Sequence, residues 1–130
     1  MNANYANNKS SDLKASYDLL IQSLIGIGLI EEYPEFTFND GYSHYDVNDY
    51  RQIYSDLNLA RDCVNWLIQL TNKNGFITND GEELQPIDLI KIDLIEADKL
   101  FNYYNEKLQN MQDLLNQLRD ILVENNVISK

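Results

Sequence analysis

The stretch "IDLIKIDLIEADKLFNYYNEKLQNMQDLLNQLRDILVEN", residues 87–125, decides the fold class. It contains no glycine or proline, and its apolar residues recur at alternating intervals of three and four. Such spacing places a single apolar stripe along an α-helix. The stripe comprises Ile87, Ile90, Leu94, Ala97, Phe101, Tyr104, Leu108, Met111, Leu115, Leu118 and Leu122. We therefore predict a long third helix over residues 87–125.

One part of this stretch fits two structures. In residues 89–94, Ile90, Ile92 and Leu94 alternate with Lys91 and Asp93, which is the period of a β-strand. The spacing favours a helix there, and the strand remains the alternative.

Two further helices are predicted upstream. Residues 12–33 show helical apolar spacing before Pro34, and Gly26 and Gly28 within them are expected to let a neighbour approach closely. Residues 49–73 follow a capping Asn48 and are apolar on two sides. The predicted fold is thus mainly α, an elongated bundle of three principal helices with turns or hairpins at 35–47 and 75–85. We expect the polar side of the second helix to face solvent, and its residues are Asn58, Asp62, Asn65 and Gln69.

Residues 70–81 resemble a calcium-binding EF-hand loop, with Asn72 and Asn74 at two ligand positions. Calcium requires several carboxylates, yet Leu70 and Gly81 occupy the positions of the first and last acidic ligands. The alternative is a helix that ends near a left-handed glycine, followed by a turn. We therefore predict no metal site in this loop.

The motifs "FTFNDG" at residues 36–41 and "FITNDG" at residues 76–81 lie forty residues apart, each after an apolar helix. A duplicated unit of helix and turn would produce this echo. Two short matches in an asparagine-rich chain also arise by chance.

The totals indicate one soluble domain at residues 11–130 after a disordered polar tail at 1–10. The net charge of −11 disfavours direct binding to nucleic acid or to an anionic membrane. Cys63 is the only cysteine, and the start lacks the features of a signal peptide, so we expect a cytoplasmic protein.

No pattern of residues indicates catalysis. His44 is the only histidine, Cys63 lies on an apolar helix stripe, and the phosphate-binding, nucleophile and zinc motifs are missing from the sequence. We predict a protein that is not an enzyme and that has no cofactor or metal.

The acids concentrate in residues 31–62, where eight acids and two bases give a net charge of −6. Tyrosines and phenylalanines alternate with these acids in residues 31–56, and tyrosine is enriched at protein interfaces. We predict that this segment binds a basic protein surface. The alternative is that Tyr50 and Tyr54 belong to the core side of the second helix while the other aromatic residues lie on a loop. The predicted contacts are Tyr33, Phe36, Asp40, Tyr42, Tyr45, Asp46 and Asp49.

The predicted third helix would be about 58 Å long, whereas a compact chain of this size has a radius of gyration of about 14 Å. A bend, an elongated bundle or another subunit must cover the excess, and we predict a homo-oligomer. Its self-association residues are expected to be Leu108, Met111, Leu114, Leu115, Leu118, Ile121 and Leu122.

Three functions fit the size and charge. The first is a phage or mobile-element inhibitor that docks on a basic groove of a host nucleic-acid enzyme. The second is an oligomeric structural or assembly-chaperone protein, and the third is an immunity or antitoxin protein. The identity of the partner does not follow from the sequence.

Overall fold

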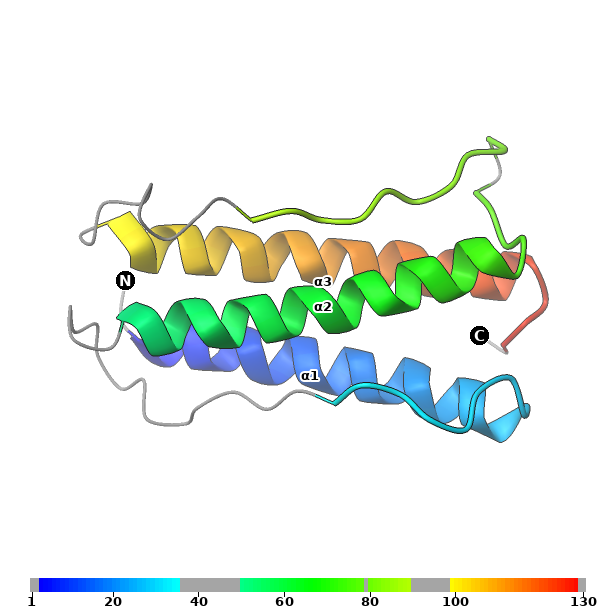
Figure 1. Cartoon of the computed structure of the whole chain (residues 1–130), viewed down its shortest axis with the longest axis horizontal. Helices are drawn as coiled ribbons and strands as arrows, with labels where there is room; N and C mark the ends of the chain where they lie inside the picture. The colour runs from blue at the N-terminus through cyan, green and yellow to red at the C-terminus, as the bar shows by residue number, and fades with distance from the viewer. Residues whose placement is uncertain (1–2, 36–49, 79, 90–98, 129–130) are drawn as a thin grey trace.

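The described residues form three helices of matched length. The computed structural model describes residues 3–35, 50–78, 80–89 and 99–128. Within these, α1 comprises Ala3–Gly26, α2 Tyr50–Lys73 and α3 Leu100–Glu124, with 24, 24 and 25 residues. Each helix is about 36 Å long at ~1.5 Å per residue. Figure 1 shows the three helices side by side, which confirms the predicted mainly α bundle.

All three helices run in the same direction (Figure 1). The end of one helix is therefore about 36 Å from the start of the next, a distance that no short turn spans. Residues 27–49 and 74–99 connect the helices, and we name them the first and second return segments. Their described parts, 27–35 and 74–89 without Asn79, run back along the helices (Figure 1). Most of the excursion predicted at 35–47 lies outside the described residues.

Each helix ends in the same hydrogen-bonded motif. Gly28, Gly75 and Asn126 adopt left-handed φ angles of 77°, 78° and 60°. The next residue in each case donates its N–H to the carbonyl of the residue five positions earlier, over 3.0, 3.1 and 2.8 Å. These second residues are Leu29, Phe76 and Val127, and all three pack against the core. The predicted helix end at Gly75 is therefore confirmed, and it has two counterparts.

The core consists of equivalent positions on the three helices. Residues 4, 8, 11 and 15 positions before each left-handed residue are all buried. Because the helices are parallel and end together, these positions form layers with one side chain from each helix. α3 packs closely against both α1 and α2, which are more widely spaced from each other. From the helix ends inward, the layers are Leu24, Thr71 and Leu122; Leu20, Leu67 and Leu118; Tyr17, Val64 and Leu115; and Leu13, Ala60 and Met111.

The predicted bounds of the first helix are wrong at both ends. α1 begins at Ala3, so residues 3–10, predicted as a disordered tail, are helical. This segment has no glycine or proline, and extending an existing helix costs far less than nucleating one. The helix ends at Gly26 because Gly28 turns the chain, not because of Pro34. A methyl group on Gly26 or Gly28 would meet nothing within 4 Å, so neither glycine serves a close approach.

The third helix does not begin at residue 87. Residues 86–89 are non-helical, and α3 starts at Leu100 after Lys99, while residues 90–98 lie outside the described part of the chain. The side chain of Asn65 bonds both backbone polar groups of Ile87 at 2.9 Å, and a helix would need those groups for itself. The expected length of about 58 Å, and the uncovered surface that it implied, therefore do not arise.

The loop after α2 is a helix end followed by a tight turn. Gly81 donates its N–H to the carbonyl of Thr78 over 2.9 Å, and Thr78 donates its own N–H to Glu82 over the same distance. The echo of "FTFNDG" and "FITNDG" does not follow the structural repeat. Phe36 lies eight positions after Gly28, whereas Phe76 directly follows Gly75.

Candidate functional site

Of the residues predicted to contact a partner, the structure describes only Tyr33. Its ring is half-buried against the core, and its hydroxyl donates a 3.0 Å hydrogen bond to the Glu35 carboxylate. This hydrogen bond and the charge of Glu35 raise the pKa of the Tyr33 hydroxyl. The other predicted contacts lie outside the described residues, and they are Phe36, Asp40, Tyr42, Tyr45, Asp46 and Asp49.

The residues predicted for self-association lie inside the single chain. Leu108, Met111, Leu115, Leu118, Ile121 and Leu122 are each at most 3% exposed, and Leu114 packs against the same core. The other two helices and the second return segment provide the cover that the sequence analysis assigned to another subunit. Of the seven, only Leu114 is half-buried.

The first return segment is fixed to both α1 and α2. The Pro34 carbonyl accepts a hydrogen bond from the Tyr17 hydroxyl of α1 and a 3.8 Å contact from the Cys63 thiol of α2. Burial raises the pKa of Cys63 to about 11 and also raises the pKa of Tyr17. At neutral pH both groups are protonated, and the thiol is a buried packing group without nucleophilic character.

The second return segment is fixed over the contact between α2 and α3. The Asn72 amide donates to the Leu84 carbonyl over 3.0 Å, and Asn65 bonds Ile87 as described. Asn65 and Asn72 are about 10.5 Å apart along the helix axis, and three extended residues cover about 10 Å. The segment is therefore held at two matched points. The sequence predicted that Asn65 faces solvent. It instead forms one of the two hydrogen-bonded attachments of this segment to α2.

The parts of the return segments that run back along the helices carry only acidic charge. Residues 27–35 and 74–89 without Asn79 include no lysine or arginine, and every carboxylate on them is exposed. These carboxylates belong to Glu31, Glu32, Glu35, Asp80, Glu82, Glu83 and Asp88. The two return segments flank α2 on either side (Figure 1), so the side of the bundle that carries them is acidic.

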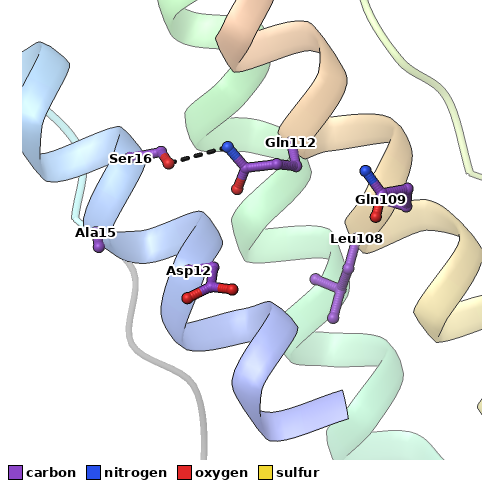
Figure 2. Close-up of a pocket in the computed structure, with 6 residues that line it drawn as sticks. All are labelled: Asp12, Ala15, Ser16, Leu108, Gln109 and Gln112. Atoms are coloured by element: carbon purple, nitrogen blue, oxygen red, sulfur yellow. Dashed lines mark hydrogen bonds between the residues drawn. The ribbon is translucent and has the colours of Figure 1, made fainter. Parts of the chain in front are cut away.

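The third contact between helices, α1 with α3, is not covered by either described return segment. Two adjoining hollows of about 370 and 210 Å³ lie along it and share Ser16. The first is lined by Asp12, Ala15, Ser16, Leu108, Gln109 and Gln112 (Figure 2). The second is lined by Ser16, Leu19, Leu20, Ser23, Leu115, Asn116, Arg119 and Ile128. We call the two hollows together the α1–α3 groove.

One polar atom in this groove lacks a partner. The Gln112 amide nitrogen donates to Ser16 Oγ over 2.9 Å and to Asn116 Oδ1 over 3.2 Å (Figure 2 shows the first). Its Oε1 is buried and accepts no hydrogen bond. A buried acceptor without a donor costs free energy, so a ligand with an N–H group would be favoured there.

The sequence pattern did not predict this groove. A signal in the sequence was available: side-chain amides recur at intervals of seven residues. They are Asn58, Asn65 and Asn72 on α2, and Gln109 and Asn116 on α3. Seven residues are two helical turns, so each set follows one line along its helix.

Comparisons with family models, with curated proteins and with solved structures find no match for this chain. Among the described residues, no three histidine, cysteine or acidic side chains gather as metal ligands, and no helix could cross a membrane.

Proposed function

We propose that the protein is a non-enzymatic, cytoplasmic binding protein whose acidic return segments dock on a basic protein surface. The observation that carries this proposal is the charge of residues 27–35 and 80–89: they carry seven exposed carboxylates and no base. The predicted contacts in residues 36–49 would extend the same surface.

The anchoring of the segments supports binding over mere solubility. The Pro34 carbonyl and the backbone of Leu84 and Ile87 are bonded to helix side chains, so the nearby carboxylates start from fixed backbone positions. Preorganised groups lose less conformational entropy on binding than groups on a free loop.

The finer proposal is an inhibitor from a phage or mobile element that covers the nucleic-acid-binding groove of a host enzyme. A row of carboxylates complements the lysines and arginines that otherwise contact phosphates. An immunity protein that covers a basic toxin would use the same chemistry. An oligomeric assembly chaperone is the weaker alternative, because the residues that motivated it are buried within one chain.

The test is the salt dependence of binding to the partner that the intact protein captures from its source cells. Glu31→Lys combined with Glu32→Lys should weaken binding about tenfold or more at about 50 mM salt, and the loss should shrink as salt screens the charges. The matched control is Glu106→Lys, which reverses one exposed charge on α3. Equal affinities for the double variant and the wild type, at all salt concentrations, would contradict the proposal.

A further inference from the structure

The protein covers two sides of the bundle with its own extended chain, between α1 and α2 and over α2 and α3. The first return segment covers α1–α2 through Pro34, and the second covers α2–α3 through Leu84 and Ile87. The described chain enters the α1–α3 groove only at its end, where Ile128 lines one hollow. Leu19 remains 69% exposed beside it, the largest exposure among the large apolar residues described.

The open groove repeats the polar anchor of a filled one. Asn65 lies ten positions before Gly75, and Asn116 lies ten positions before Asn126, the corresponding left-handed residue of α3. Asn65 bonds the N–H and the carbonyl of Ile87, whereas Asn116 faces the groove and is exposed. The corresponding amide therefore lies at the same height on the next helix, where its Oδ1 accepts one hydrogen bond from Gln112 and keeps a second lone pair.

A second amide adds to this match. Gln112, one turn before Asn116, contributes the buried Oε1 that has no hydrogen-bond donor. The Asn116 amide offers both a donor and an acceptor. This suits an extended peptide, whose backbone N–H and carbonyl groups are not hydrogen-bonded to each other. A docked helix would not suit it, because a helix uses its own backbone groups internally.

We propose that the α1–α3 groove binds an extended peptide segment of a partner protein, running antiparallel to the helices, with Asn116 bonding its backbone. This site is separate from the acidic surface. By analogy with Leu84, Ile87 and Leu89, the peptide carries apolar residues two or three positions apart, and these cover Leu19 and Leu20.

The charges at the two ends set the direction and sequence of the peptide. Arg119 lies one helical turn beyond Asn116, toward the C-terminal end of α3. Asp12 lies toward the N-terminal ends of the helices, about 9 Å from the level of Asn116, when positions on α1 and α3 are counted from their left-handed residues. Neither residue forms an ion pair within the described chain. The peptide therefore carries an acid one or two residues before the bonded position and a base about three residues after it.

The test uses a fluorescein-labelled peptide copied from residues 83–90 with Gln85→Glu and Ile90→Lys, titrated into the whole protein. We expect saturable binding with a dissociation constant below about 1 mM. Amide NMR shifts should be confined to residues 12–23 and 108–119. Asn116→Ala should weaken binding about tenfold, since two hydrogen bonds are lost. Gln117→Ala, an exposed amide that does not line the groove, should leave it unchanged.

A charge-swapped peptide, with Gln85→Lys and Ile90→Glu, should bind less tightly, and Arg119→Glu should remove that difference. Failure of the first peptide to saturate, or equal affinity for Asn116→Ala and wild type, would overturn the proposal. Sedimentation of the protein alone gives a further outcome. A dimer that Leu19→Asp dissociates would show that a second copy fills the groove, and would overturn the peptide assignment.

Discussion

The side-chain amide of Asn65 bonds both the N–H and the carbonyl of Ile87, each over 2.9 Å, across 22 residues of chain. This pair replaces the hydrogen bonds that Ile87 would make in a helix or a sheet. It ties the second return segment to α2, and thereby allows α3 to lie parallel to α2.

Asn65→Ala should lower the free energy of unfolding by about 1–3 kcal/mol, because two backbone groups of Ile87 lose their partner. Urea denaturation followed by circular dichroism measures this loss. Gln69→Ala, an exposed amide one turn further along α2, is the matched control and should change stability by less than about 0.5 kcal/mol. Equal stability of the two variants would mean that the return segment is held by its apolar residues alone.

The glycines near the end of α1 should respond in opposite ways. Gly28→Ala forces a side chain into a left-handed conformation at φ 77° and should cost about 1–2 kcal/mol. Gly26→Ala lies within the helix in open space and should stabilise the protein by up to about 1 kcal/mol. Thermal melts of the two variants decide the matter, and a reversed order would be inconsistent with the helix end described here.

Leu108→Asp or Leu115→Asp should destabilise the protein by more than about 3 kcal/mol, since each leucine is only 1% exposed and the new charge would be buried in the core. Asn110→Asp, at a partly exposed position on the same helix, should have a much smaller effect. Chemical denaturation compares the three variants. Similar unfolding midpoints would refute the helical register of α3.

Stability should fall as pH rises from about 9 to 11. Burial raises the pKa of Cys63 from its ordinary value of 9.0 to about 11, so the folded state disfavours the thiolate. Its contribution is complete below pH 9 and is lost as pH rises through 11. Tyr17, whose pKa is also raised, acts in the same direction at higher pH. Denaturation at pH 8 and pH 10 should show a smaller decline for Cys63→Val, and an unchanged decline would exclude the thiol as a cause.

The heptad spacing predicted the core well. Leu57, Val64 and Leu67 on α2, and Leu108 and Met111 on α3, are buried as their stripes indicate. Apolar spacing measures the period of a helix, which is a local property, so it survives the errors in the helix bounds.

The same spacing carries no information about direction, and the parallel arrangement could not be read from it. The useful signal lay in the connections. With the observed bounds, residues 27–49 and 74–99 are far longer than ordinary links between helices in a bundle. Extending the third helix back to residue 87 concealed the second of these connections. The role of Asn65 depends on Ile87, a distant residue, so a pattern local to α2 assigns it to water.

Hydrogen–deuterium exchange of the protein with and without its captured partner tests the central claim most directly. The account predicts that the partner slows exchange in residues 27–35 and 80–89 at low salt, and that this protection fades as salt is raised. If the partner leaves the exchange rates of both return segments unchanged at every salt concentration, the acidic docking surface is contradicted.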